Sequence, residues 1–448
     1  MAKAGAGAKS GAAGSSATNG GSNGAANGGK AGSAAPSDGA NGQGGQGIKD
    51  SDEVFRDDML RTFELTFSDA DWNQLQQTAT EEMYVPAMLS VDGAPVGKIG
   101  IRYKGATGTL QGCFSNGMQT CAKLSMKVSF DEYESNLRFH GLKKLNFHSS
   151  MNDHSHLHER LSYKLFRDFG VLAPRSVHAR VKINGEYKGL YNLTEDVDGR
   201  FTDYHFMGED GKGTLYKEAW PSASQDPGYY TNAQRTNEGT PVTKILQFAG
   251  DLAKAGDDQL GNVVSHWMDP DATLRYLAVH SAVKHWDGPL TFYCTKEYGC
   301  NNHNFYFYES VTKDQVALVA WDVDNTFLDN SLPDQANVPS WYEPTTDCDV
   351  AAHTEKEDFL PPGCDRLVQG FVQLGVDKFR AMIGTFAAGP FNVEALRADV
   401  DRWAAQIDES VKTDPAGTGY DDWRGSVEQL KTMIEARHSR AEAIRDGN

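Results

Sequence analysis

HWDG at residues 285–288 and AWDVDNTF at residues 320–327 are the most informative stretches of this 448-residue chain. The second follows the apolar run VALVA, which predicts a buried strand with Asp322 and Asp324 at its end. Side chains two apart on an extended chain point to one side, so both carboxylates can face one divalent cation. The first stretch places Asp287 at the end of a predicted helix. Together the three acids favour metal-assisted phosphate chemistry, although each alone could simply cap a turn.

The N-terminal segment differs in composition from the rest of the chain. Residues 1–47 contain no Val, Ile, Leu, Phe, Tyr, Trp or Cys. Such a tract of Gly, Ala, Ser and Asn buries no apolar surface, so residues 1–49 are predicted to be a disordered tether. The roughly 400 residues that remain suffice for one large two-lobed domain or for two ordinary domains.

Charge and hydropathy exclude some classes of partner. The net charge of −18 argues against nucleic acid and against an anionic membrane surface. No apolar run approaches the roughly 20 residues that a transmembrane helix needs. Met1-Ala2-Lys3 runs directly into the tether without an apolar leader.

The six cysteines fall into three close pairs, Cys113/Cys121, Cys294/Cys300 and Cys348/Cys364. Each pair brackets a polar loop with Gly or Asn, which predicts three local disulfides and an oxidising compartment. Zinc binding is the alternative, but no CxxC spacing occurs, and six cysteines allow fifteen connectivities. We therefore expect a secreted or surface-anchored protein whose export leader is absent from this chain.

The sequence pattern of the first half of the chain predicts strands joined by tight turns. Alternating apolar residues flank Asp92-Gly93 and Asn184-Gly185, both strong hairpin signals. The strand after the first turn runs into a loop of small residues with one lysine, 104–108. Such a loop can hold a phosphate group, but it is also found in ordinary turns.

A lysine-bearing strand and one helix follow. In KLSMKVSF, residues 123–130, Lys123 and Lys127 share one strand face. That face is either an anion site beside the small-residue loop or a solvated outer surface. The helix predicted over Asp153–Gly170 has a leucine stripe, and Glu159 lies well round from it.

Helices dominate the second half, from about residue 243 onward. One is predicted to begin at Asp269-Pro270, an N-cap followed by proline at N1, and to end before Asp287. A strand-rich half followed by a helix-rich half with the acidic residues predicts an α+β chain with two lobes.

The order and spacing of these motifs resemble those of the CotH family, the spore-coat protein H kinases, which are atypical members of the protein-kinase-like fold. The resemblance runs from Phe63 to the C-terminus and is carried by RYKGATG, KLSMKVSF, NGEYKGLYNLTEDVD, GTLYK, HWDG, HNFYFY and AWDVDNTF. It implies a strand-rich N-lobe over 54–200 and a helix-rich C-lobe over 201–448. It also implies an ATP-dependent kinase that uses Mg²⁺ or Mn²⁺ and phosphorylates Ser or Thr of an extracytoplasmic protein.

The resemblance assigns the acidic residues. Asp287 corresponds to the family's catalytic Asp, which in kinases orients the substrate hydroxyl and accepts its proton. Asn304 and Asp322 resemble the metal ligands, with Asp324 as a possible second carboxylate and Asn302 as the alternative to Asn304. Carboxylate and amide oxygens suit a hard divalent cation.

The nucleotide side is assigned by element order. Lys127 is the predicted phosphate-contacting strand lysine, and Glu159 is its predicted helix partner. Glu195 falls where the chain crosses between the lobes, a position at the adenine edge.

Two departures from the family pattern affect this assignment. Lys104 and Gly105 stand in a loop that in the family reads more like RGxSS, and Lys lacks the bidentate fork of Arg. Thr107-Gly108 replaces the two serines. The segment between the second pair of cysteines resembles an insertion between Asp287 and Asn304. These two residues can therefore meet only if the insertion forms a short loop that a disulfide closes.

Two other functions fit parts of the chain. VALVAWDVDNTF matches the first motif of haloacid-dehalogenase-type phosphatases, with Asp322 as nucleophile and Asp324 as acid/base. That motif normally opens a doubly wound domain, whereas only about a quarter of this chain follows it. A non-catalytic surface or coat binding protein, a pseudokinase or adhesin, is the third reading, because fold does not guarantee activity. Intact site residues also leave AMP transfer as an alternative to phosphate transfer.

Overall fold

The structure is a computed structural model that describes residues 50–106, 109–115, 118–206, 208–328, 340–343, 345 and 347–447. The predicted tether and Thr107-Gly108 of the predicted phosphate loop lie outside these residues. The chain divides into two units, Met1–Gly42 and Gln43–Asn448, and every feature below belongs to the second.

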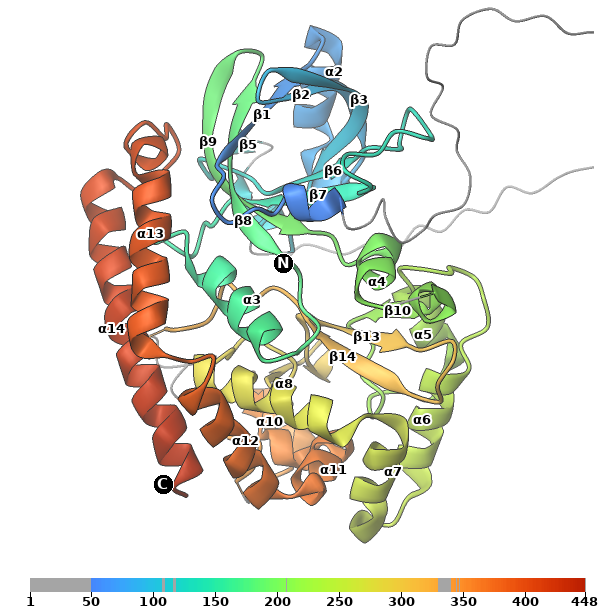
Figure 1. Cartoon of the computed structure of the whole chain (residues 1–448). Helices are drawn as coiled ribbons and strands as arrows, with labels where there is room; N and C mark the ends of the chain where they lie inside the picture. The colour runs from blue at the N-terminus through green and yellow to red at the C-terminus, as the bar shows by residue number, and fades with distance from the viewer. Residues whose placement is uncertain are drawn as a thin grey trace, which may run out of the picture. The chain divides into compact units, whose positions relative to one another are not determined.

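Seven strands of the first half close into a barrel in the order β1-β2-β3-β6-β7-β9-β8 (Figure 1). Their bounds are β1 Arg61–Thr66, β2 Val85–Val91, β3 Ala94–Tyr103, β6 Met126–Ser129, β7 Lys144–His148, β8 Ser176–Ile183 and β9 Glu186–Glu195. Neighbouring strands run antiparallel except β1 and β8, whose parallel pairing closes the ring. The inward-facing apolar residues of these strands form one hydrophobic core.

Both predicted hairpins are confirmed. β2 and β3 turn at Asp92-Gly93, and β8 and β9 turn at Asn184-Gly185. All four turn residues have positive φ, between 49° and 84°. Turns of this hand match the right-handed twist of the strands, and Asp, Asn and Gly tolerate this conformation best.

Helix α3, His158–Asp168, packs beside strand β8 of the barrel. It begins five residues after the predicted start at Asp153, because the Asp153 carboxylate accepts from the main-chain N–H groups of Ser155 and His158. The side chain of Asp153 thus accepts main-chain N–H groups before the helix, and this local turn competes with an earlier helix start. The leucine stripe of α3 is buried, as the spacing predicts.

The second half is mainly helical and has its own hydrophobic core. Its helices are α4 Gly199–His205, α5 Pro227–Ala233, α6 Lys244–Lys254, α7 Leu260–Trp267, α8 Pro270–Val283, α10 Val350–Lys356, α11 Arg366–Leu374, α12 Val376–Ala388, α13 Val393–Lys412 and α14 Tyr420–Arg445. A short helix of the first half, α2 Asp69–Gln77, lies at the barrel. In the described part of the chain no helix is long and apolar enough to cross a bilayer.

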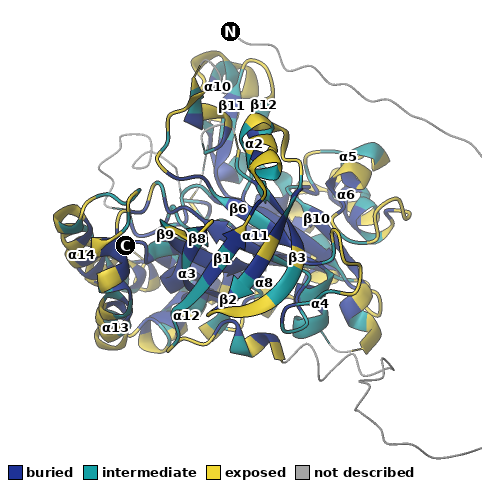
Figure 2. Cartoon of the chain, turned by 90° about the horizontal axis from the view of Figure 1, so that it is seen from above, coloured by how far each residue is buried: buried dark blue, intermediate teal, exposed yellow. Residues whose placement is uncertain are grey.

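Three small sheets complete the fold. β10 Thr214–Lys217, β13 Phe305–Glu309 and β14 Val316–Ala320 form an antiparallel sheet. β11 Phe292–Thr295, β12 Gly299–Asn301 and β15 Phe359–Leu360 form a second one, and β4 Phe114–Ser115 pairs with β5 Met118–Gln119. Figure 1 shows the β13–β14 sheet between the barrel and helix α8, and Figure 2 shows exposed residues gathered on outer helices such as α13 and α14. The chain is thus a mixed α+β protein, as predicted.

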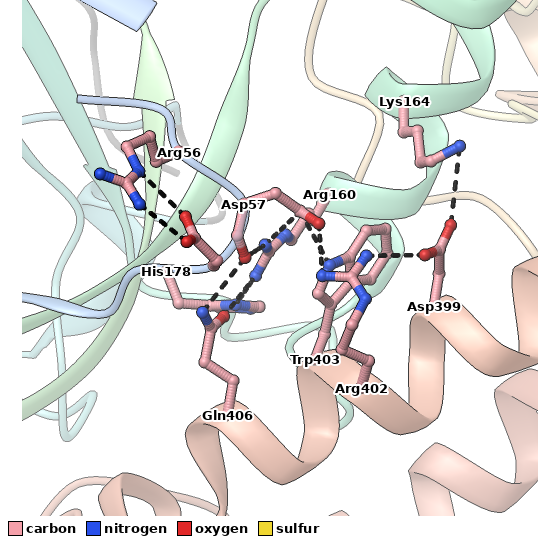
Figure 3. A network of polar contacts seen from close by, with 10 residues as sticks. Arg56, Asp57, Arg160, Lys164, His178, Asp399, Arg402, Trp403 and Gln406 are labelled. Carbon is pink, nitrogen blue, oxygen red and sulfur yellow. Dashed lines mark hydrogen bonds and ion pairs between the residues drawn. The ribbon is translucent and has the colours of Figure 1, made fainter. Parts of the chain in front are cut away.

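Arg160 of α3 is a buried cation that contacts residues from several elements (Figure 3). Its guanidinium donates to the carboxylate of Asp57 at 2.5 Å and to Oε1 of Gln406 on α13 at 3.0 Å. It also lies 2.8 Å from Nδ1 of His178 on β8 and packs over the ring of Trp403. A buried charge is tolerated when it is paired and hydrogen-bonded. This network therefore holds α3 between the barrel and α13.

Candidate active site

One cleft of about 760 Å³ is lined by the barrel, by α3 and by the ends of β13 and β14. It contains eight of the nine predicted site residues: Lys104, Gly105, Lys127, Glu159, Asp287, Asn304, Asp322 and Asp324. Residues from both halves of the chain therefore face one space, as the motif pattern indicates.

The side chain of Asp287 is held by four donors. The Tyr293 hydroxyl on β11 donates to its Oδ1, and Nε2 of His303 lies 2.9 Å from the same oxygen. The amide groups of Asn304 and Asn325 donate to Oδ2, each at 3.1 Å. These contacts fix the carboxylate in one orientation, and they bring Asn304 to Asp287 across the intervening insertion.

The surroundings of Asp287 favour its charged form. Burial would raise the pKa of this carboxyl, but the hydrogen bond and charge of His303 and the hydrogen bond of Tyr293 outweigh burial and hold the pKa below its ordinary value. The contact also raises the pKa of His303, against the opposing effect of burial. A carboxylate kept ionised and oriented can accept a hydrogen bond from a hydroxyl group.

The three predicted disulfides are confirmed: Cys113–Cys121, Cys294–Cys300 and Cys348–Cys364. The second joins β11 to β12. It thus closes the loop that separates Asp287 from Asn304. Strand β11 of the same hairpin carries Tyr293, whose hydroxyl contacts Asp287. Tyr293 precedes the first cysteine of this pair and lies in none of the motifs, so no sequence signal marks it, whereas His303 stands next to Asn304 in HNFYFY and could have been predicted from that motif.

Asp322 and Asp324 follow β14 and line the cleft. The main-chain N–H of Asp322 donates to the Tyr163 hydroxyl at 3.0 Å, and its carbonyl lies 3.1 Å from Nε2 of His285. Burial first, then the charges of Asp322, Glu159 and Asp287, raise the pKa of Asp324 well above its ordinary value. Crowded acids of this kind are relieved by a cation.

The side-chain oxygen atoms in this part of the cleft are of the kind that bind a hard metal ion. Asn304, Asp322 and Asp324 offer amide and carboxylate oxygens, which suit Mg²⁺ or Mn²⁺. Among the residues that the structure describes, no three His, Cys, Asp or Glu side chains are arranged as a complete metal site. A metal here would complete its coordination with water and phosphate oxygens, as Mg²⁺ commonly does.

The sheet that ends at Asp322 does not match the phosphatase motif. β14 pairs antiparallel with β13 in a three-stranded sheet. The strand before a haloacid-dehalogenase motif belongs instead to a doubly wound parallel sheet. The fold around Asp322 therefore argues against its role as the nucleophile of such a phosphatase.

Glu159 and Lys127 have different partners from those expected. Nδ1 of His148 lies 2.8 Å from Oε1 of Glu159, and Nε2 of His148 lies 2.7 Å from Nζ of Lys104. Lys127 instead forms an ion pair of 2.7 Å with Asp196. The expected Lys127–Glu159 contact is thus replaced by two separate ones.

Strand register explains this difference. Lys127 on β6 stands opposite Asn146 on β7, and Asn146 donates to Asp196 at 3.0 Å. The lysine therefore meets Asp196 at the end of β9. Lys104 is placed at the end of β3, and burial lowers its pKa to about 8 despite the opposing charge of Asp322.

Glu195 is absent from the described lining of the cleft. Its buried carboxylate is engaged by the guanidinium of Arg175. The next residues, 196–198, do line the cleft, so the chain reaches it directly after Glu195. Burial first, then the charge of Asp196, raise the pKa of Asp198 to about 6.

Comparison with known proteins agrees with the motif pattern. The family model described as CotH kinase protein matches residues 101–440. The chain is 22% identical over 279 residues to inner spore coat protein H of Bacillus subtilis (strain 168), in an alignment that covers 60% of this chain and 69% of that protein.

Two solved structures share little with this chain. The Shewanella oneidensis MR-1 toxin–antitoxin complex of HipA, HipB and operator DNA aligns with 11% identity over 72% of this chain and 66% of that chain, with a TM-score of 0.28. The Helicobacter pylori proinflammatory kinase CtkA aligns with 8% identity over 70% of this chain and 94% of that chain, with a TM-score of 0.31. At these TM-scores neither structure supports an argument about this fold.

Proposed function

The chain belongs to the CotH kinase family, and on this basis we propose that it transfers the γ-phosphate of ATP to Ser or Thr of an extracytoplasmic protein. In this proposal the fold is two-lobed and kinase-like, with the barrel as one lobe and the helical half as the other. The observation that supports it most directly is the single cleft that gathers Lys104, Lys127, Asp287, Asn304 and Asp322.

The lysines would bind the phosphates of the nucleotide. Lys127 lies within β6 and Lys104 directly follows β3, and both line the cleft. Gly105 has a positive φ of 153° after β3, and a Cβ there would meet Oγ1 of Thr109 at 2.7 Å, so only glycine allows this tight turn of the loop beside the cleft. Glu159 acts through His148, which orients Lys104.

Asp287 would accept the proton of the acceptor hydroxyl. Its four hydrogen-bond donors fix the orientation of the carboxylate, and its lowered pKa keeps the carboxylate ionised. Asn304, Asp322 and Asp324 would hold Mg²⁺ or Mn²⁺. The metal, when bound, neutralises charge on the phosphate oxygens. Main-chain groups after Glu195 would contact the adenine edge, because the Glu195 side chain is engaged by Arg175.

A location outside the cytoplasm belongs to the same proposal. Three disulfides are compatible with an oxidising compartment. The relative from Bacillus subtilis is an inner spore coat protein by name. The Gly-, Ala-, Ser- and Asn-rich segment over 1–49 would serve as a tether to a surface.

The test is incorporation of label from γ-labelled ATP into Ser- and Thr-containing peptides, with Mg²⁺ or Mn²⁺. We expect the wild type to label the peptides, Asp322→Ala to lose nearly all label, and Asp421→Ala, an exposed acid on α14, to retain it. Full activity of Asp322→Ala would overturn the metal assignment. The intact mass of a labelled peptide distinguishes added phosphate from added AMP. Absence of any metal-dependent thermal shift with ATP would identify a pseudokinase.

A further inference from the structure

Two of the predicted metal ligands have an uncommon backbone conformation. Asp322 has a φ of 53° and Asn304 has a φ of 64°. This left-handed region is disfavoured for residues with a side chain, although Asp and Asn enter it more readily than most. It persists where neighbouring groups hold the main chain in place. We therefore expect other side chains to hold the main chain at both positions.

Helix α3 holds the main chain of Asp322. The Tyr163 hydroxyl accepts a hydrogen bond of 3.0 Å from the Asp322 N–H group, and Tyr163 is fully buried. One residue earlier on α3, the Ser162 hydroxyl lies 2.6 Å from the Thr326 hydroxyl. The segment from Asp322 to Thr326, which contains Asp324, is thus fixed to α3 at both of its ends.

Glu218 holds the main chain of Asn304. Glu218 directly follows β10, and its Oε1 accepts a hydrogen bond of 3.2 Å from the Asn304 N–H group. The two hydrogen bonds of the Asn304 side chain are both made by its amide nitrogen, to Asp287. Asn304 is thus restrained through its main chain as well as through its side chain, and its amide oxygen is left to bind a cation.

We propose that Tyr163 and Glu218 are positioning residues for the metal ion. By accepting these two N–H groups they keep Asp322 and Asn304 in the left-handed conformation, so that the ligands need not be reordered when the ion binds. A site that is ordered in advance binds more tightly, because less conformational freedom is lost on binding. Without its acceptor each N–H group loses its partner, and the main chain can return to a commoner conformation. This role rests on the metal assignment made in the proposed function.

Helix α3 then connects the two chemical parts of the cleft. Glu159 and Tyr163 are four residues apart on α3 and lie on the same side of it. Glu159 contacts His148, whose other ring nitrogen faces Lys104, whereas Tyr163 contacts Asp322. A displacement of α3 therefore reaches the predicted phosphate-binding lysine and the predicted metal ligand together.

The test is a titration of the whole chain with Mn²⁺, without nucleotide, in which the electron paramagnetic resonance signal reports the free ion. We expect the wild type to bind Mn²⁺ and Asp322→Ala to lose binding. Tyr163→Phe removes one hydroxyl group and should weaken binding about tenfold, through the loss of one hydrogen bond. Tyr276→Phe on α8 is the matched control and should bind as the wild type does, because Tyr276 is also buried and its hydroxyl has no partner among the described residues.

Glu218 provides a second pair of variants, which keeps the test valid if Tyr163→Phe fails to fold. Its side chain is only partly buried. Glu218→Gln retains an oxygen that can accept from the Asn304 N–H group, so it should bind Mn²⁺ within about threefold of the wild type. Glu218→Ala has no acceptor and should bind about tenfold more weakly.

The positioning role is wrong if Tyr163→Phe and Glu218→Ala bind Mn²⁺ as tightly as the wild type while Asp322→Ala does not bind it; the metal assignment would then stand alone. Absence of binding in the wild type, or full binding by Asp322→Ala, would reject the metal assignment and the positioning role together. An equal loss in Tyr276→Phe would reveal a general effect of altering the core and would reject the role of Tyr163. Equal losses in Glu218→Gln and Glu218→Ala would make Glu218 a ligand instead of a positioning residue.

Discussion

Nδ1 of His148 lies 2.8 Å from Oε1 of Glu159 within the wall of the cleft. The carboxylate also accepts from the Thr194 hydroxyl at 2.8 Å and from the Asn192 amide at 3.3 Å. The remaining ring nitrogen of His148 faces Lys104. A histidine thus stands between the helix acid and the loop lysine, so the lysine is oriented through an intermediate side chain.

Glu159→Gln should destabilise the protein in a pH-dependent way. Burial would raise the pKa of Glu159, but the charge and hydrogen bond of His148 outweigh it, and the net pKa is lowered. The resulting stability is present above the unfolded pKa, about 4.5, and is lost as the pH falls through the folded value. We expect a loss of about 1–3 kcal/mol at pH 7 by urea unfolding, shrinking below pH of about 4.5. Glu132→Gln, on the surface, should show no such loss; an equal loss would contradict the assignment.

Tyr293→Phe should slow transfer and leave nucleotide binding unchanged. The variant removes one of four donors to the Asp287 carboxylate and preserves the ring, which stacks on His303. A hydrogen bond to a charged group contributes about 1.5–3 kcal/mol, so we expect kcat to fall by about tenfold or more with KM for ATP unchanged. Steady-state kinetics measures both constants.

The matched control for this variant is Tyr298→Phe. Tyr298 belongs to the same stapled hairpin but is 64% exposed. An equal fall in kcat for both variants would show that the hairpin is merely sensitive to mutation. A rise in KM in Tyr293→Phe alone would place the tyrosine at the nucleotide instead.

Arg160→Met should unfold the protein more easily than Arg402→Met does. Both arginines pair with Asp57 (Figure 3), but the Arg160 side chain is 1% exposed and that of Arg402 is 47% exposed. Removing Arg160 takes away its hydrogen bonds to His178 and Gln406, at a cost of about 1–3 kcal/mol, whereas an exposed pair contributes about 0–1 kcal/mol. Chemical denaturation of the two variants compares them directly. Similar losses would show that the network does not anchor α3.

Asp198→Asn should stabilise the protein at neutral and alkaline pH. The pKa of Asp198 is raised to about 6, by burial and then by Asp196, so ionisation costs stability as the pH rises from about 4 to about 6. Asn retains the N-cap of α4, because it caps as well as Asp. We expect a gain on the order of 1 kcal/mol or more at pH 8, vanishing below pH of about 4, by thermal unfolding.

Asp349→Asn provides the comparison for that gain. Asp349 is the exposed N-cap of α10, a helix of the same length as α4. It should show no pH-dependent gain. If Asp198→Asn were neutral at pH 8, the interpretation of Asp196 and Asp198 as mutually repelling acids would be wrong.

Local signals predicted the parts of this fold that depend on near neighbours. Asp92-Gly93 and Asn184-Gly185 predict the positions of their hairpin turns, because few residues tolerate the positive φ that such turns require. The apolar run before Asp322 is a buried strand, as its composition indicates. The resemblance to the CotH family also implied that Asp287, Asn304 and Asp322 belong to one site, and all three line one cleft.

Contacts between distant segments were not predictable in the same way. The partner of Lys127 depends on which residue of β7 stands opposite it, and the hydrophobic pattern does not specify that register at the polar end of a strand. Tyr293 lies only six residues after Asp287, but no local signal indicates that β11 turns its hydroxyl back onto that carboxylate. The parallel pairing of β1 with β8 joins segments more than a hundred residues apart and has no local signal.

That pairing also limits how this protein can associate with others. A ring of seven strands presents no continuous open edge, so another chain cannot readily extend it by donating a strand. Assembly through the barrel must therefore proceed by complementary side-chain surfaces, which point mutations can disrupt one at a time.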